Sequence, residues 1–142
     1  MKRFVRYICF ILALSLVFVT PAFAAETDNA RSSSYFAKCS AYLTTVSGNT
    51  FKVNFRITAT GLMDELGSSM IIVQRRASSS DPWENAKTFY PSTYTNMIDY
   101  DQITHASSVT YTGTSGYEYR AYVEFYAKNS NGTAYAGAYA YF

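Results

Sequence analysis

The sequence has little of the chemistry on which most enzymes depend. Its 142 residues include two cysteines, one histidine and one tryptophan, and Cys9 lies in an apolar run near the N-terminus. Cys39 alone cannot form an intrachain disulfide, so the domain must rely on its apolar core. Gly-rich phosphate loops, a serine-nucleophile elbow and zinc-ligand spacings are also missing. These absences favour a non-catalytic protein that uses no cofactor and no metal.

Long hydrophobic runs are restricted to the N-terminus. "MKRFVRY" carries three basic residues, "ICFILALSLVFVT" is apolar, and "PAFAA" places small residues at Ala22 and Ala24. This order indicates a secretory signal peptide over residues 1–24, cleaved after Ala24. Its apolar stretch is shorter than the ~20 residues of a spanning helix, and a retained membrane anchor is the alternative. We therefore expect a secreted, extracellular protein with no membrane span once the leader is removed.

An excess of basic residues is absent from the rest of the chain. Three of the twelve basic residues lie in the leader, against none of the ten acidic ones, which leaves nine basic and ten acidic residues. Nucleic-acid binding needs a basic stripe that pairs with phosphates, and no such stripe occurs, so we expect no nucleic-acid partner. Export without disulfides is more typical of a bacterial envelope or exterior than of an animal secretion.

Helical periodicity is also absent, and an alternation of period two takes its place. Residues 25–33 are polar and unpatterned, which predicts a flexible N-terminus. In "FKVNFRIT" (51–58), every second residue is apolar, as in a half-buried strand. Further strands are predicted at 35–44, 68–76, 83–90, 108–113, 117–128 and 133–142, with turns at 47–49 and 129–132 and a long, partly irregular connection over 91–107. This spacing predicts an all-β fold, an antiparallel seven-stranded two-sheet sandwich that spans residues 34–142.

The order of these features resembles a fibronectin type III domain, one of the immunoglobulin-like β-sandwiches. "FKVNFRI" matches the second strand of that family, and "IIVQRR" with "SDPWENAKTF" matches the third and fourth. Gly116 and Tyr119 match its Gly-x-x-Tyr corner, and the resemblance implies that the Tyr119 hydroxyl caps a backbone group. The chain departs from the family in having Phe55 where a tryptophan is usual, and it has no Arg-Gly-Asp. It is also similar to small, secreted, single-domain bacterial proteins of unknown function.

Catalytic and metal-binding candidates are few. A pair of Cys39 and His105 is conceivable, but Cys39 lies in a predicted strand where a small thiol packs in the core. His105 lies in a polar stretch, where we expect a solvated loop. The closest carboxylates, at 64–65 and 99–101, match neither a calcium loop nor a glycosidase spacing. We expect solvated turn residues there, and a hydrolase with dispersed carboxylates is only the third hypothesis.

Tyrosine is what the sequence has in abundance, with 14 residues. In the strand 117–128, alternation assigns Tyr117 and Tyr119 to the inner face, together with Val123. The later tyrosines of this strand and the tyrosines of the last strand share the outer face if the alanines of the last strand pack inward. This outer set comprises Tyr122, Tyr126, Tyr135, Tyr139 and Tyr141.

Such rings give contact area at low entropic cost, so the outer set is a candidate surface for binding an unknown protein or carbohydrate ligand. The alternative is that these rings only shield neighbouring strands. Trp83 is expected to pack in the core or, alternatively, to be a second stacking anchor. The sequence therefore predicts a secreted, non-catalytic binding module. A small secreted toxin, bacteriocin or inhibitor is the competing class.

Overall fold

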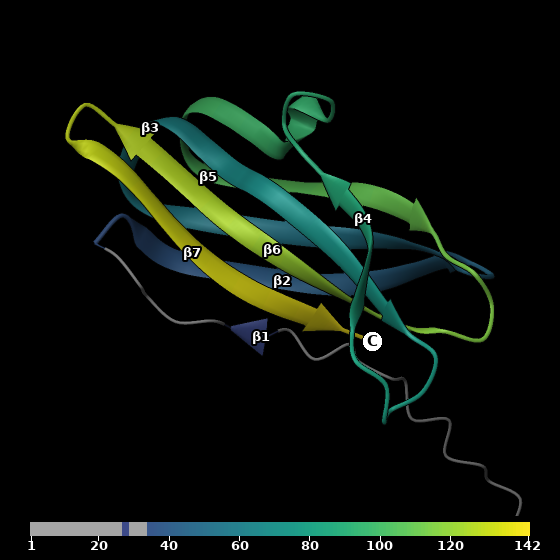
Figure 1. Cartoon of the computed structure of the whole chain (residues 1–142). Coiled ribbons are helices and arrows are strands. Elements are labelled where there is room, and N and C mark those ends of the chain that lie inside the picture. Colours follow the sequence, from purple (N-terminus) through teal and green to yellow (C-terminus); the bar gives the residue numbers. More distant parts are fainter. Residues whose placement is uncertain (1–26, 29–33) are drawn as a thin grey trace, which may run out of the picture.

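The computed structural model describes residues 27–28 and 34–142, and this part of the chain consists of strands joined by turns (Figure 1). The predicted leader, and the segment 25–33 apart from β1, lie outside the described residues. Among the described residues, no helix is long and apolar enough to cross a membrane. The elements in chain order are β1 (Thr27–Asp28), β2 (Phe36–Ser47), β3 (Thr50–Arg76), β4 (Glu84–Phe89), the 3₁₀ turn η1 (Thr95–Met97), β5 (Ile98–Thr112), β6 (Glu118–Asn129) and β7 (Gly132–Tyr141).

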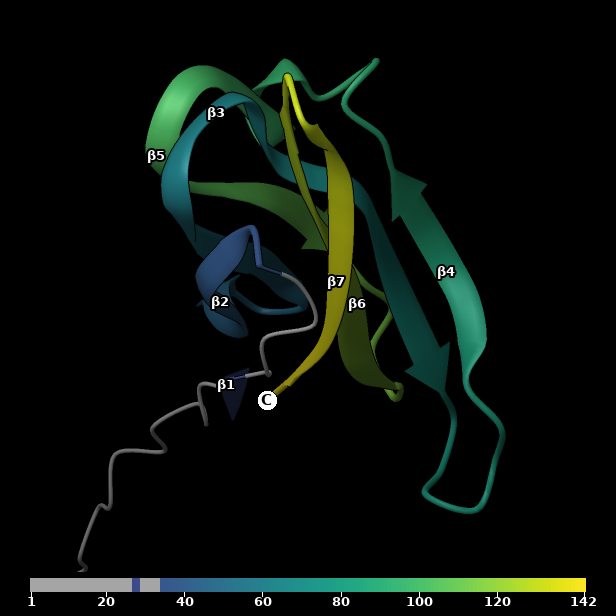
Figure 2. The ribbon, with the colours of Figure 1, turned by 90° about the vertical axis from the view of Figure 1, so that its left-hand side faces the viewer.

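The strands form one antiparallel sheet, in the order β1-β2-β3-β6-β7, with β4 and β5 also paired to β3. β3 is the centre of this sheet because it has 27 residues and both of its edges are paired along most of its length. Its first part pairs with β2 on one edge and with β5 on the other. Its second part pairs with β6 and β4. The sheet is curled (Figure 2), and the predicted all-β, antiparallel class is confirmed.

The strands predicted at 51–58 and 68–76 are two parts of one long strand, β3. The residues between them are also paired, since Met63 opposes Gln102 of β5 and Leu66 opposes Ala127 of β6. The alternation continues past the register shift with β5 between Thr58 and Met63, and it breaks at Leu66, where the buried side of β3 changes. It changes again after Ser68, where the register with β6 shifts, because extra residues at such an irregularity bend the strand and alter which side chains face inward. As β1 has only two residues, six longer strands build the curled sheet.

β5 is longer than the sequence indicates. The irregular connection predicted over 91–107 ends at η1, and β5 continues as a strand from Ile98 to Thr112. Asp101 has a φ of 54° within this strand, a left-handed conformation that Asp adopts more readily than most residues. It disturbs the alternation of "IDYDQ" and hides the strand from a pattern of period two. Met97, at the end of η1, is buried in the core.

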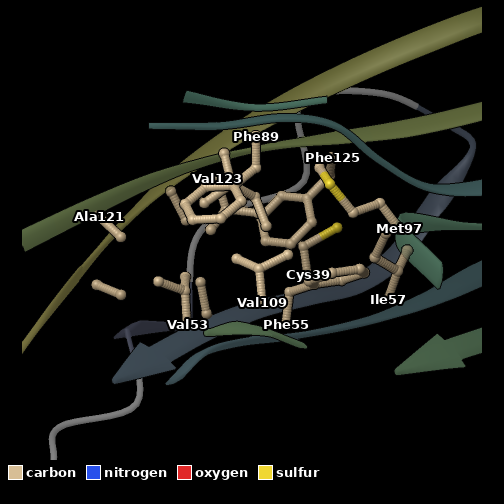
Figure 3. Packing of buried hydrophobic residues seen from close by; sticks show 14 of the residues in the cluster. Cys39, Val53, Phe55, Ile57, Phe89, Met97, Val109, Ala121, Val123 and Phe125 are labelled. Atoms are coloured by element: carbon tan, nitrogen blue, oxygen red, sulfur yellow. The ribbon is translucent and has the colours of Figure 1, made fainter. Parts of the chain in front are cut away.

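The core lies inside the curl of the sheet, and both parts of β3 contribute to it. Phe55 from the first part and Val73 from the second part are buried, together with Phe125 of β6. Cys39 of β2 and Met97 pack in the same cluster (Figure 3). Truncating a fully buried ring such as Phe125 to alanine typically costs about 3–5 kcal/mol. The two ends of the sheet are therefore held together by one shared apolar cluster.

Short hairpins fix the register of the strands on both sides of the molecule. The β2–β3 loop has two residues and begins with Gly48, whose φ of 51° suits glycine. In the β6–β7 hairpin, Asn129 opposes Gly132, and the backbone N–H of Asn131 donates to Asn129 Oδ1 at 2.9 Å. The turns predicted at 47–49 and 129–132 are confirmed. The second of them sets which side chains of β6 and β7 lie opposite one another.

Candidate functional site

The tyrosine face is the outer side of β6 and β7. Along β7, Ala134, Ala138 and Ala140 are buried, and on β6 Val123 and Phe125 are buried in the same way. The side chains between them point away from the core, as alternation in a strand requires. This face comprises Tyr122, Tyr126, Tyr135, Tyr139 and Tyr141, of which the last three have exposed fractions of 55%, 37% and 44%.

The rings of the tyrosine face pair across the two strands. Tyr122 lies opposite Tyr139, with ring centroids 5.1 Å apart and ring planes at 54°. Tyr126 lies opposite Tyr135, with centroids 5.5 Å apart and planes at 54°. Along β7, the Tyr139 and Tyr141 centroids are 6.3 Å apart, at 34°. Each close aromatic pair contributes roughly 0.5–1.5 kcal/mol. Because the rings are tilted, the surface they form is ridged rather than flat.

Tyr122 is the base of the tyrosine face, because its ring packs on Gly137 of β7. The Tyr122 Cε2 and Cζ atoms lie 2.8 Å from the position that a Cβ on Gly137 would occupy. Burial of this ring raises the pKa of Tyr122, and the Glu124 carboxylate raises it further. Glycine at position 137 therefore makes room for a half-buried ring and leaves the tyrosines of β7 as the exposed part of the face.

One end of the tyrosine face is fixed by the carboxylate of Glu65. The Tyr126 hydroxyl donates to Glu65 Oε2 at 3.0 Å, and Lys128 Nζ donates to Oε1 at 2.7 Å. The hydrogen bond from Lys128 and then that from Tyr126 lower the pKa of Glu65. Burial raises the pKa of Tyr126 to about 12, and its hydrogen bond to Glu65 adds to the shift. Because the hydroxyl is bound to Glu65, Tyr126 offers mainly its ring to a ligand.

At the other end, the tyrosine face continues into arginine and tryptophan side chains. Arg120 lies on the outer side of β6, opposite Tyr141, and its Nε donates to Gln74 Oε1 at 2.8 Å. The Arg120 guanidinium lies 4.5 Å from the ring centroid of Tyr139 and 4.5 Å from that of Trp83. Cation–π contacts of this kind are worth roughly 0.5–1 kcal/mol at exposed sites. The guanidinium is therefore held in place by one hydrogen bond and two rings.

Trp83 also contacts a second guanidinium, that of Arg76 at the end of β3. The Arg76 guanidinium lies 4.4 Å from the Trp83 ring centroid, and its Nε donates to Glu118 Oε2 at 2.6 Å. Its Nη1 donates to the carbonyl oxygen of Ser79 at 3.1 Å. Trp83 is half-buried and lies outside the core cluster, which corrects the expectation that it packs in the core.

A cleft of about 590 Å³ opens beside these side chains. Its lining includes residues of the β2–β3 loop, the start of β6 and the end of β7. Its volume falls within the roughly 300–1,000 Å³ of typical small-molecule sites. Gly48 and Asn49 line it from the β2–β3 loop, and Arg76, Glu118 and Arg120 contribute charged groups. The remaining wall is largely aromatic, with Phe51, Trp83, Tyr117, Tyr119, Tyr141 and Phe142.

Tyr119 fixes one wall of the cleft from the inner side of β6. Its hydroxyl accepts a hydrogen bond from the Thr114 backbone N–H at 2.6 Å and donates to the Thr114 carbonyl oxygen at 3.1 Å. This is the backbone cap that the family resemblance implies. Tyr117 differs from the inner position that alternation assigns, because β6 begins one residue after it. It is 38% exposed and lies 4.8 Å from the guanidinium of Arg75.

The other candidates from the sequence lie elsewhere. Cys39 is buried in the core. The solvated loop expected for His105 is wrong, because His105 lies in β5 and only 11% of its side chain is exposed. Its Nε2 lies 3.0 Å from the Asn96 carbonyl oxygen, and its Nδ1 lies 3.7 Å from Asp99 Oδ2. Within residues 27–28 and 34–142, no group of three or more His, Cys, Asp or Glu side chains could hold a metal ion.

Sequence reasoning missed the arginines of this site. Arg120 did carry a signal, since alternation places it on the same outer side as Tyr122. Arg76 and Phe142 carried none, because they line the same cleft as Arg120 and Trp83 only through the folding of distant segments.

Comparisons with known proteins add no family to this description. The chain matches no protein-family model, and it matches neither a curated protein nor a solved structure.

Proposed function

We propose that the protein is an exported, non-catalytic binding module that recognises a partner outside the cell through its tyrosine face. The observation that carries this proposal is the placement of five tyrosine rings on the outer side of two neighbouring strands, over a layer of buried apolar side chains. A folded domain gains less from an exposed ring than from a buried one. Export is proposed from the leader-like residues 1–24.

The chemistry of the face favours a protein partner over a flat polysaccharide. Tyrosine, tryptophan and arginine are the residues that dominate binding energy at protein interfaces, and all three lie side by side here as Tyr139, Trp83 and Arg120. Ring planes tilted at 54° and 34° do not form the single plane on which a row of sugar rings would stack. A glycan ligand is the alternative that the experiment below distinguishes.

We further propose that the fold is a fibronectin type III-like or immunoglobulin-like sandwich in which β3 supplies both the second and the third strand. The pairings support this. β2, the first part of β3 and β5 pair as the first, second and fifth strands do in that plan, and the second part of β3, β6 and β7 pair as its third, sixth and seventh. The hydroxyl of Tyr119 bound to Thr114 has the contacts of a tyrosine corner.

Two matched alanine variants test the binding role. Tyr139 on the tyrosine face and Tyr42 on β2 have the same exposed fraction, 37%. Purified wild-type protein, Tyr139→Ala and Tyr42→Ala are applied to an array of bacterial cell-surface glycans and to an array of envelope proteins. We expect a protein ligand whose affinity falls at least about tenfold in Tyr139→Ala and is unchanged in Tyr42→Ala.

Thermal unfolding of the same variants separates binding from stability. Loss of the ring pair with Tyr122 and of the cation–π contact with Arg120 should cost Tyr139→Ala about 1–2.5 kcal/mol, so we expect both variants to stay folded at assay temperature. Equal affinity of the two variants would contradict the proposal, as would the absence of a ligand on either array. If a glycan binds and its binding depends on Tyr139, the tyrosine face is still the binding surface, but the partner is a glycan rather than a protein.

A further inference from the structure

The cleft at the end of the sheet contains one guanidinium whose charge no carboxylate neutralises. Arg76 is paired with Glu118 at 2.6 Å. Arg120 has no carboxylate at ion-pair distance among the described residues, and its Nε donates a hydrogen bond to the neutral amide of Gln74. A hydrogen bond between a guanidinium and an anion is about twice as strong as one between neutral groups. A half-buried guanidinium without an anion is therefore less stable than one that is paired. The cleft therefore has a place for one negative charge.

The position of Arg120 is fixed before any ligand arrives. Its Nε is bound to Gln74, and its plane is held near the rings of Trp83 and Tyr139. This leaves the two Nη groups as donors, and a guanidinium presents such donors in a fork that matches a carboxylate. Groups that are ordered in advance lose little entropy on binding.

The rest of the cleft suits an apolar body. Phe51 packs against Phe142 with ring centroids 5.1 Å apart and against Tyr119 with centroids 5.4 Å apart. These rings line the cleft together with Tyr141 and Trp83. An aromatic wall beside a few convergent polar groups is the usual composition of a small-molecule site.

We propose that this cleft binds a small organic carboxylate with a flat apolar or aromatic body. The carboxylate pairs with the Nη groups of Arg120, and the body lies against the aromatic wall. A monoanion fits better than a phosphate ester, which carries about −1.5 to −2 charges at neutral pH, because the carboxylate of Glu118 lines the same cleft. The inference goes beyond the proposed function and does not require it, since a small ligand occupies the cleft whether or not the tyrosine face has a partner.

The test uses three probes that differ only in the polar group. The purified protein, labelled with ¹⁵N, is titrated with phenylacetate, phenylacetamide and phenyl phosphate while the Trp83 indole N–H and Arg120 Nε–H signals are followed. We expect saturable shifts with phenylacetate and at least roughly tenfold weaker binding of the uncharged amide. Equal affinity for the acid and the amide would overturn the proposal, as would tighter binding of the phosphate or no binding of any probe.

Arginine variants assign the effect to one side chain. Arg120→Gln should reduce the affinity for phenylacetate to that for phenylacetamide, and Arg120→Lys, which keeps the charge without the planar fork, should give an intermediate value. Arg56→Gln, an exposed arginine of β3 outside the cleft, serves as the control and should bind as the wild type does. If Arg120→Gln and Arg56→Gln bind phenylacetate alike, the assignment is wrong. None of these outcomes depends on the comparison of Tyr139 with Tyr42, so failure here and failure of the proposed function are separate results.

Discussion

Replacing Gly67 with alanine tests the close approach of β3 to the start of β5. A Cβ on Gly67 would overlap the carbonyl oxygen of Met97 and would lie 2.7 Å from Ile98 Cα and 2.9 Å from the Met97 carbonyl carbon. All three are backbone atoms, and they are held by the pairing of Gly67 with Ile98. Gly61, on the same strand, has nothing within 4 Å of an added Cβ. The two glycines therefore form a matched pair.

The magnitudes follow from these contacts. Overpacking costs typically 1–3 kcal/mol, and backbone neighbours cannot rotate away as a side chain can, so we expect Gly67→Ala to lower the free energy of unfolding by about 3 kcal/mol. Gly61→Ala removes freedom from the unfolded chain without a collision and should raise it by about 0.5 kcal/mol. At about 4 °C per kcal/mol for a domain of this size, the melting temperatures of the two variants should differ by roughly 14 °C.

Urea unfolding followed by circular dichroism measures both variants. The expected result is a lower midpoint for Gly67→Ala at an unchanged slope, and a midpoint at or slightly above that of the wild type for Gly61→Ala. If Gly67→Ala lies within 1 kcal/mol of Gly61→Ala, β5 does not begin against Gly67, and the reasoning on the length of β5 fails with it.

Three further predictions concern hydroxyl and carboxyl groups. Tyr119→Phe, which removes the two hydrogen bonds to Thr114 but keeps the ring, should cost about 1–2 kcal/mol in urea unfolding, whereas Tyr111→Phe should stay within 0.5 kcal/mol of the wild type; equal losses would refute the cap. The pKa of Tyr126 lies at about 12, above its ordinary 10.0, so its contribution to stability is present below pH 10 and is lost as the pH rises towards 12. Tyr126→Phe should lack this alkaline loss in unfolding measured against pH, and an unchanged profile would contradict it. The pKa of Glu65 is lowered from 4.5, so its contribution to the free energy of unfolding is present above pH 4.5 and is lost as the pH falls below that value. Glu65→Gln should therefore lose less stability than the wild type on acidification. An equally steep loss of stability would count against the pairing of Glu65 with Tyr126 and Lys128.

Period-two alternation predicted most of the strands and the side on which the final tyrosines lie. The pattern succeeded in β6 and β7 because their pairing keeps one register throughout, without a shift. Tyr122 lies opposite Tyr139, and Tyr126 lies opposite Tyr135. One face of each strand is buried on the core, and this requires an apolar residue at most inward positions.

Alternation failed where the backbone departs from regular pairing. The buried side of β3 changes at Leu66 and again after Ser68, and β5 contains Asp101 with a positive φ. A pattern of fixed period ends at such points even though the strand continues. The predicted boundary at 58–68 and the predicted loop over 91–107 both arise in this way.

The cleft could not be predicted from the sequence at all. Its charged groups, Arg76, Glu118 and Arg120, come from two strands, and Trp83 comes from the loop before β4. Alternation relates Glu118 to Arg120 on β6, but no spacing relates either of them to Arg76, because that proximity depends on the pairing of β3 with β6. Sequence patterns report which side of one strand a residue occupies, and they do not report which strand end lies beside another.

The uninterrupted course of β3 has a consequence for how the molecule opens. Since β3 supplies paired backbone to β2 and β5 at one end and to β4 and β6 at the other, neither end can release it without loosening the other. Native-state hydrogen exchange should then give the amides of Val53 and Val73 a common opening free energy, equal to that of global unfolding. We expect a domain held together in this way to lack a stable, partly open form, and to be either folded or fully unfolded in cells.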